Sequence, residues 1–213
     1  MTLRNKQILI TAGPTWVAID KVRVISNLAT GETGIILAKK LNLLGARVTL
    51  LLGQVKEPKI PRRIRLIRYR FFEELASRIT KELKTGKYDI IIHAAAVCDY
   101  RPSSKYDGKI HSGLRKFQLK LEPTPKIIDT IKRITKRKLV LVGFKYEPDS
   151  SLKALIKESK KLILRANADI VIGNSYHNKI YRALIVEDKS CSGPYKNKTD
   201  LASKLIKELN RIN

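Results

Sequence analysis

Short apolar runs alternate with longer amphipathic segments along most of the chain. Short apolar runs are typical of strands in a buried parallel sheet, and apolar residues at i, i+3 and i+4 are typical of helices that cover one. The runs predict strands at Gln7–Ala12, Arg47–Leu52, Ile64–Tyr69, Asp89–Ala94, Leu139–Lys145, Asp169–Gly173 and Ala183–Glu187. The amphipathic segments predict helices at Gly34–Leu44, Phe72–Lys84, Pro125–Thr135, Ser151–Ala166 and Asp200–Leu209. The pattern predicts an α/β fold, Rossmann-like and doubly wound, with a mostly parallel sheet.

One segment breaks this alternation. Tyr100–Pro123 is rich in Lys, Gly, Ser and Pro, and within it Lys116–Leu121 alternates polar and apolar residues. Such alternation is typical of a strand, but the segment has no evident place in a parallel sheet. It predicts a protruding flap that contains a hairpin.

Length and composition favour one globular domain over residues 1–213, because 43% of the residues are hydrophobic. No apolar run approaches the ~18 residues of a membrane helix. Met1–Gln7 leads directly into a strand and leaves no room for a signal peptide, which predicts a cytoplasmic protein without a membrane partner.

The cysteines and histidines do not suggest a site. Cys98 and Cys191 lack metal-ligand spacing, so no metal site is expected, and no catalytic role is assigned to the three histidines.

The chain is strongly basic, with 44 Lys and Arg against 19 Asp and Glu and a formal net charge of +25. This charge suits either a nucleic-acid binder or an enzyme that acts on polyphosphates. The basic residues are scattered over many elements, without an aromatic and basic binding motif. Most of them are therefore expected to form solvated surface, and no nucleic-acid partner is expected.

The first candidate site surrounds the first long helix. Gly31 and Gly34 lie where the helix begins, so that backbone N–H groups could approach an anion. Arg23 can hold a carboxylate or a phosphate through two hydrogen bonds, and Asn27 offers a donor to a developing oxyanion. A salt-bridged arginine and a turn-forming asparagine are the alternative, since these residue types serve both purposes.

Further candidates follow later strands. Small side chains after Ile92 leave space at the carboxyl edge of the sheet, where Asp99 could bind a ribose, a base or a metal-bound phosphate. Lys109, in the flap, could close over a phosphate. Pro125 suits the first turn of a helix, and Phe144 could face a base. The alternatives are an Ala-rich packed strand, an ordinary surface lysine and a core phenylalanine.

In this order, the segments resemble phosphopantothenoylcysteine synthetase, the synthetase half of a bifunctional coenzyme A biosynthesis flavoprotein. The resemblance runs from about Ile8 to Asn174 and covers ITAGPT, ID-x-VR-x-ISN, a glycine loop, AAAV-x-DYRP, the KI of the flap, TP-x-I, VGF and AD-x-V-x-x-N. The chain departs from the family at Ala29–Gly34, where SSGKMG is usual. It also departs at Lys126, where Asp is common, and at Lys145–Tyr146, where two alanines are usual.

The resemblance implies roles for individual residues. It assigns Asn27 and Lys109 to catalysis, and Arg23, Asn27, Ala96 and Val97 to phosphopantothenate and the acyl-nucleotide. It assigns to the nucleotide Gly31, Gly34, Ala94, Ala95, Asp99, Lys109, Pro125, Lys126, Ile127, Ile128, Phe144, Lys161 and Arg165. The last two stand where the family has two lysines four residues apart, after what looks like a short insertion.

The resemblance also implies a reaction. CTP, with Mg²⁺, would activate 4'-phosphopantothenate, and cysteine would then displace CMP; ATP stays open as the nucleotide. It implies a homodimer closed by the flap. No segment before Met1 could supply the flavin-dependent half, so only the ligase is expected, with room for a separate decarboxylase partner. The alternative is a short-chain NAD(P) oxidoreductase, but no tyrosine has a lysine four residues later.

Overall fold

A computed structural model describes residues 3–56, 59–135, 138–178 and 180–212. Eight strands form one sheet in the order β12-β11-β10-β9-β6-β1-β4-β5. Their bounds are β1 Gln7–Pro14, β4 Arg47–Leu52, β5 Arg65–Arg68, β6 Ile90–Ala96, β9 Val140–Tyr146, β10 Ile170–His177, β11 Ile180–Val186 and β12 Cys191–Tyr195. All neighbours from β5 to β10 are parallel, whereas β11 and β12 are antiparallel additions. The predicted α/β fold with a mostly parallel sheet is confirmed.

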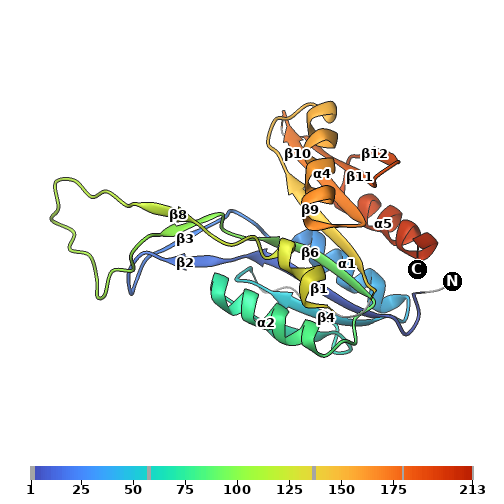
Figure 1. The fold of residues 1–213 in the computed structure, drawn as a ribbon, viewed down its shortest axis with the longest axis horizontal. Helices are drawn as coiled ribbons and strands as arrows, with labels where there is room; N and C mark the ends of the chain where they lie inside the picture. Colours follow the sequence, from blue (N-terminus) through green and yellow to red (C-terminus); the bar gives the residue numbers. More distant parts are fainter. Residues whose placement is uncertain (1–2, 57–58, 136–137, 179, 213) are drawn as a thin grey trace.

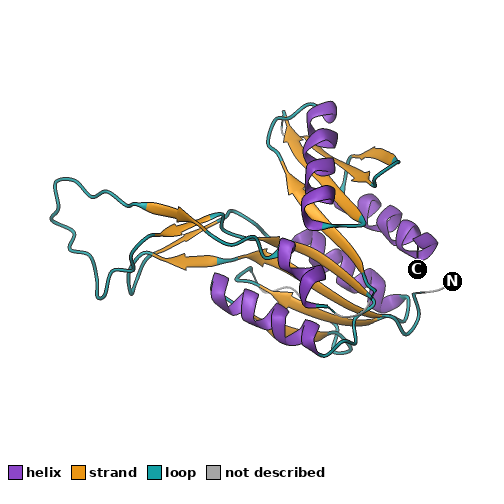
Figure 2. Cartoon of the chain, in the orientation of Figure 1, coloured by secondary structure: helices purple, strands orange, loops and turns teal. Residues whose placement is uncertain are grey.

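Helices cover both faces of this sheet (Figure 2). The first face carries α1 (Glu32–Leu43) and α5 (Lys198–Ile212). The second carries α2 (Phe72–Lys84), α3 (Ile128–Ile134) and α4 (Leu152–Ala166). Successive residues of a strand point to opposite faces, and the central strands are therefore apolar at nearly every position. All seven predicted long strands and all five predicted helices are present, with ends shifted by a few residues.

A two-layered arm leaves the carboxyl edge of the sheet (Figure 1). One layer pairs β2 (Trp16–Ala18) with β3 (Val24–Ser26), and the other pairs β7 (Tyr100–Pro102) with β8 (Leu121–Pro123). The two layers contact each other through β2 and β7. The long connection from β7 to β8 forms the outer end of the arm. The protruding flap predicted for this segment is confirmed.

The antiparallel pair expected within the flap is present, at the base of the flap. None of the described residues between 103 and 120 forms a strand, so the strand predicted at Lys116–Leu121 is wrong except for Leu121, where β8 begins. The antiparallel pair lies at the base of the flap, in β7 and β8. An alternating sequence becomes a strand only where a neighbour can pair with its backbone, and the outer loop meets no such neighbour within the described chain.

The strand order reverses between β1 and β6. From β1, the chain passes through α1 to β4 and on to β5, and α2 then returns it to β6 on the other side of β1. Open α/β sheets bind ligands beyond the carboxyl ends of their strands at such a reversal. The ends of β1 and β6 are therefore the place to look for a site. None of the helices in the described ranges is long and apolar enough to cross a bilayer.

Candidate functional site

The segments that leave β1 and β6 are joined by hydrogen bonds. Thr15 N donates to Ala96 O at 3.1 Å, and Cys98 N donates to the Thr15 hydroxyl at 2.9 Å. The Cys98 thiol donates to Thr15 O at 3.2 Å. Because Cys98 is buried and bonded in this way, its role is to hold the two strand ends together.

Two buried side chains stabilise the same strand ends, and neither was assigned a role from the sequence. The Tyr69 hydroxyl donates to Ala12 O and Gly13 O at 2.8 and 2.9 Å, and burial raises its pKa so that it stays protonated. His93 lies beside Thr11, with Nδ1 and Oγ1 3.0 Å apart, and burial lowers the pKa of His93 to about 4. Thr11 Oγ1 also accepts from Ala95 N at 3.2 Å, so the Thr11 hydroxyl joins His93 to the end of β6.

Asn27 connects the glycine loop to the end of β6. Its Nδ2 donates to Ala96 O at 3.2 Å and to Val97 O at 3.0 Å. The structure thus brings together the three residues Asn27, Ala96 and Val97, which were predicted to form one substrate site. A side-chain amide has two N–H donors, and here both are directed at backbone carbonyls. The Asn27 amide can therefore donate to an oxyanion only after one of these bonds is exchanged.

Gly31 and Gly34 occupy different environments. Gly31 precedes α1 with φ of 68°, and a Cβ there would lie 3.0 Å from Gly13 N, so the loop passes close to the end of β1. Gly34 is buried inside α1, and a Cβ there would lie 2.5 Å from Ala12 Cβ. Gly34 therefore allows the helix to pack closely against β1, which is a structural requirement of nucleotide-binding units.

We expect Gly34→Ala to lower the free energy of unfolding by about 1 to 3 kcal/mol, because the new methyl group overpacks the contact with Ala12. Urea denaturation measures this loss. Gly113→Ala is the matched control, since a Cβ at Gly113 meets nothing within 4 Å. The double variant Gly34→Ala/Ala12→Gly should recover part of the loss, and a loss that the second substitution leaves unchanged would argue against this contact.

Asp99 and the segment before α3 lie side by side. Thr124 N donates to Asp99 O at 2.9 Å, and the Thr124 hydroxyl donates to Cys98 O at 2.6 Å. Lys126 Nζ reaches Asp99 Oδ1 at 2.6 Å, in an exposed ion pair. The carboxylate predicted to face the nucleotide thus already has a cation beside it. Lys126 occupies the position where the resembled family commonly has Asp.

The helix after this segment starts later than predicted. Pro125, Lys126 and Ile127 precede α3, which begins at Ile128. Two tight turns open it, in which Asp129 N and Thr130 N donate to the carbonyls three residues before them. Pro125 was predicted in the first helical turn and lies instead before the helix, directly after Thr124, whose backbone is bonded to Asp99.

The remaining nucleotide candidates are distributed around this region. Ala94 and Phe144 pack against the core under α1 and α5, whereas Ala95 packs against the opposite core. Phe144 is thus partly buried at the end of β9. Arg165 Nε donates to Asp129 Oδ1 at 3.1 Å, which joins α4 to the start of α3, and Lys161 pairs with Glu158 within α4. Of these two cations, only Arg165 is linked by a described contact to the segment that holds Ile128.

Arg23 lies at the outer end of β3, and Asn27 lies at its inner end. Four residues of extended strand span roughly 13 Å, so the two side chains are not neighbours within one chain. A spacing of four brings residues together on a helix but separates them along a strand, so Arg23 and Asn27 lie at opposite ends of β3. Lys109 is likewise at the outer end, since Lys21 N donates to Gly108 O at 2.9 Å.

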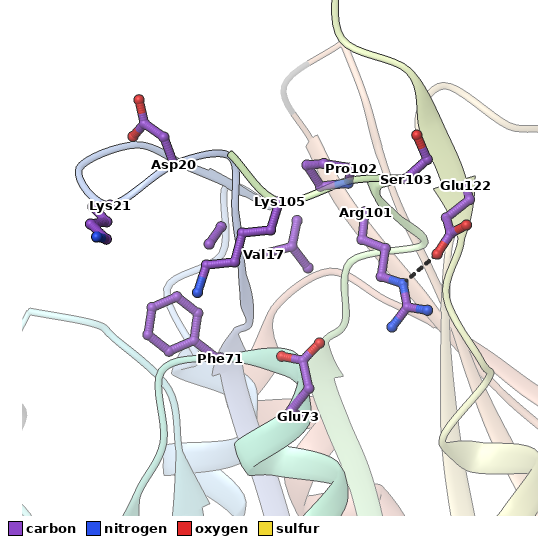
Figure 3. A pocket seen from close by; sticks show the side chains of 11 residues that line it. Val17, Asp20, Lys21, Phe71, Glu73, Arg101, Pro102, Ser103, Lys105 and Glu122 are labelled. Atoms are coloured by element: carbon purple, nitrogen blue, oxygen red, sulfur yellow. Dashed lines mark hydrogen bonds and ion pairs between the residues drawn. The ribbon is translucent and has the colours of Figure 1, made fainter. Parts of the chain in front are cut away.

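A groove of about 680 Å³ runs beside the base of the arm (Figure 3). Val17 and Phe71 lie in it, and Arg101 pairs with Glu122 along one side at 2.9 Å. The Lys105 side chain points toward Phe71. No motif in the sequence predicted this groove, because it forms where β2, α2 and the flap meet.

A resident metal site would need a cluster of ligating side chains. The described residues contain no group of three or more His, Cys, Asp or Glu side chains that could hold an ion. Asp99, which follows the end of β6, is paired with Lys126. One carboxylate is too few to hold an ion by itself, but it suits a magnesium ion that is already bound to the phosphate oxygens of a nucleotide.

Comparison with known proteins identifies the family. The model of the DNA/pantothenate metabolism flavoprotein C-terminal domain matches residues 3–212. The chain belongs to this family. A bifunctional coenzyme A biosynthesis protein CoaBC from Thermococcus kodakarensis is 37% identical over 99% of this chain. A CoaBC protein from Borreliella burgdorferi is 32% identical over 97%. The chain spans 52% and 53% of these two relatives.

Solved structures of the family have the same fold. The DNA/pantothenate metabolism flavoprotein from Streptococcus pneumoniae superposes with a TM-score of 0.87 at 25% identity, over 98% of this chain and 100% of the other. The C-terminal domain of a CoaBC protein superposes with a TM-score of 0.80 at 25% identity, over 100% and 98%. The resemblance to the synthetase half of the flavoprotein is thereby confirmed. The alternative, a short-chain NAD(P) oxidoreductase, is set aside.

Proposed function

We propose that the protein is a phosphopantothenate–cysteine ligase of coenzyme A biosynthesis. The observation that carries the proposal is the family match over residues 3–212, which covers the synthetase half of CoaBC proteins. The convergence of the Asn27 loop and the Thr124–Ile128 segment on the end of β6 supports it. We propose CTP as the nucleotide, with ATP as the alternative.

In the first step, a carboxylate oxygen of 4'-phosphopantothenate attacks the α-phosphorus of CTP. A bond from carboxylate oxygen to phosphorus forms, and the bond to pyrophosphate breaks. The proposed cytidine site lies around Asp99, Lys126 and the segment up to Ile128, with Phe144 and Arg165 at its borders. Lys109 and Lys126 offset the crowded negative charge, which is the main electrostatic demand of this step.

In the second step, the amine of cysteine attacks the acyl carbon, and the bond from that carbon to the phosphate oxygen breaks to release CMP. The intermediate is tetrahedral and carries an oxyanion. We assign Asn27 to this oxyanion, with its amide exchanging a backbone carbonyl for the substrate oxygen. The amine proton passes to water, and no nucleophilic side chain takes part.

The separation of Arg23 and Asn27 supports a division of roles between them. The substrate carries a phosphate at one end and a carboxylate at the other. Arg23 at the outer end of β3 suits the phosphate, and Asn27 at the inner end suits the carboxylate that reacts. An extended substrate along the arm can therefore contact both residues, although they are roughly 13 Å apart.

Magnesium enters this proposal with the nucleotide. Mg²⁺ is usually bound by substrate phosphates and one or two carboxylates, and Asp99 is the carboxylate available here. Bound in this way, the ion neutralises phosphate charge. The protein's own contribution would be to orient the nucleotide, with Lys126 kept beside Asp99 by their ion pair.

We also propose a homodimer, because apolar side chains are exposed along the arm. They include Val22, Tyr100, Tyr106, Leu114, Phe117 and Leu121. Apolar surface gathered on one element is typical of an interface. The cytoplasmic location and a separate decarboxylase partner stay predictions.

The function is tested by measuring pyrophosphate release from a panel of nucleoside triphosphates with 4'-phosphopantothenate, with and without cysteine. We expect release with CTP and formation of phosphopantothenoylcysteine only when cysteine is added. Turnover with ATP and not with CTP would change the proposed nucleotide but leave the proposed ligation in place. Turnover with none of the nucleotides would overturn the proposal.

We expect Arg23→Ala to raise the KM for phosphopantothenate far more than the KM for the nucleotide. Removing a guanidinium from an anionic group typically costs about 2 to 3 kcal/mol. Steady-state kinetics with each substrate varied in turn measures the difference, with exposed Arg63→Ala as the control for lost charge. Equal changes in both KM values would argue against a selective contact.

A further inference from the structure

The turn between β2 and β3 contains a buried carboxylate, Asp20, whose residue is only 3% exposed. Its two oxygens have different partners. Oδ1 accepts from Val22 N at 2.8 Å and from Arg23 N at 2.7 Å, which are bonds within the turn. Oδ2 accepts from Ile110 N at 3.0 Å and from the Arg23 guanidinium. One oxygen therefore forms the turn, and the other joins Arg23 to the flap.

Several further contacts attach the flap to this turn. Tyr106 N donates to Ile19 O at 3.2 Å, and Lys21 N donates to Gly108 O at 2.9 Å. Arg23 Nη1 also donates to Ile110 O at 3.2 Å, and Ile110 is buried. Lys109 thus lies between two residues whose backbones are bonded to the turn. The flap is therefore attached to the turn on both sides of Lys109, and the rest of the connection to β8 begins at residue 111.

The Asp20 carboxylate is charged at any pH suitable for an enzyme assay. Burial raises its pKa, but the hydrogen bonds from Ile110, Val22 and Arg23 outweigh this effect and lower the pKa to about 2. Its hold on Arg23 and on the flap is therefore constant across the working range. Figure 3 shows Asp20 on the turn next to Lys21, above the groove.

We propose that Asp20 is a positioning residue of the ligation site, whose Oδ2 sets the direction of the Arg23 guanidinium and holds Lys109 at a fixed place on the flap. This inference rests on the proposed function, which assigns Arg23 and Lys109 to anionic groups. A residue needed only for the turn would use Oδ1 alone. The bonds of Oδ2 instead join the Arg23 guanidinium to the backbone of Ile110, the residue that follows Lys109.

The test is Asp20→Asn, because asparagine keeps an oxygen for the turn and replaces Oδ2 by an amide that faces the Ile110 N–H and the guanidinium. We expect the urea midpoint to fall, because the Ile110 N–H and the guanidinium lose their acceptor, while the protein stays folded without urea. The KM for phosphopantothenate should rise and kcat should fall, each by about tenfold or more, which is the scale on which supporting side chains act at other sites. Asp107→Asn is the matched control on the same junction, since the Asp107 side chain is almost fully exposed.

A second substitution separates positioning from a general effect on the fold. In an Arg23→Ala background, Asp20→Asn should add little further increase in the KM for phosphopantothenate, because Arg23 is the group through which Asp20 acts on that substrate. Fully additive increases would mean that Asp20 does not act through Arg23 and would overturn the proposal. An unchanged KM and kcat in the single variant would overturn it as well.

The hold on the flap has a readout that needs no turnover. Amide hydrogen exchange at Ile110 and trypsin cleavage after Lys109 should both be faster in Asp20→Asn than in the wild type and in Asp107→Asn. Equal rates in all three proteins would contradict the proposal. If the wild-type protein turned over none of the nucleotides, the proposed function would fail, whereas these two rates would still report whether Asp20 holds the flap.

Discussion

Asn27→Ala is expected to release pyrophosphate and then accumulate acyl-nucleotide on the enzyme, because the step with cysteine slows. Loss of one oxyanion donor typically costs about 3 kcal/mol, or on the order of a hundredfold or more in rate. Asn27 contacts the end of β6 through Ala96 and Val97 and does not reach the Asp99–Lys126 pair by any described bond. Nucleotide binding should therefore change little. Rapid quenching during the first turnover measures the intermediate.

Two further variants sharpen this test. Asn27→Asp would direct a carboxylate at the carbonyl oxygens of Ala96 and Val97, so we expect it to be slower than Asn27→Ala and to disturb the loop. Asn42→Ala, on the helix α1, is the control for loss of an amide elsewhere and should behave like the wild type. If Asn27→Ala abolished pyrophosphate release itself, Asn27 would belong to the first step and the assignment would be wrong.

Lys109→Ala is expected to reduce ligation by at least as much as any other substitution in the flap, through loss of the cation that closes over the triphosphate. Lys109 follows Gly108, which is bonded to the turn between β2 and β3 at the outer end of the arm, whereas Asp99 lies between β6 and β7 at its inner end. Lys109 therefore suits a nucleotide bound mainly by a second subunit. Replacing residues 105–116 by a glycine bridge should abolish activity for the same reason. Lys116→Ala is the control for a lysine elsewhere in the flap.

Mixed dimers test this crossing directly. An Asp99→Asn subunit and a Lys109→Ala subunit, each inactive or weak alone, should regenerate one intact site per mixed dimer if the flap serves the partner. Activity is measured after exchange, and differently tagged subunits report how many mixed dimers have formed. Formation of mixed dimers without return of activity would mean that each flap serves its own subunit.

Much of the architecture follows from local patterns. The apolar run at Arg47–Leu52 and the amphipathic segment Phe72–Lys84 were predicted with the ends that the structure shows. Such elements are predictable because burial on both faces requires apolar residues at nearly every position of a strand, and burial on one face requires a helical period. β12 was not predicted, since Cys191–Tyr195 is short, polar and partly exposed at the sheet edge.

The candidate site was only partly predictable. Asn27 and the end of β6 could be grouped because their motifs suggested a shared ligand, and the structure brings them into contact. The Thr11–His93 pair and Asp20 were missed as contributors, because each acts through a hydrogen bond to a residue more than 80 positions away. The separation of Arg23 and Asn27 was not predicted, since it depends on the short strand β3 between them, which the sequence pattern did not indicate.

The sequence by itself determined the α/β class, the family resemblance and the residue types available for chemistry, because periodicity and short motifs are local properties of the chain. Only the tertiary structure decided which oxygen of Asp20 faces the flap, that Lys126 pairs with Asp99, and that Gly34 serves packing against Ala12. These outcomes depend on how separate segments approach one another. Hydrogen bonds and steric contacts act over a few ångströms, so they are set by the packing of the whole sheet and its arm.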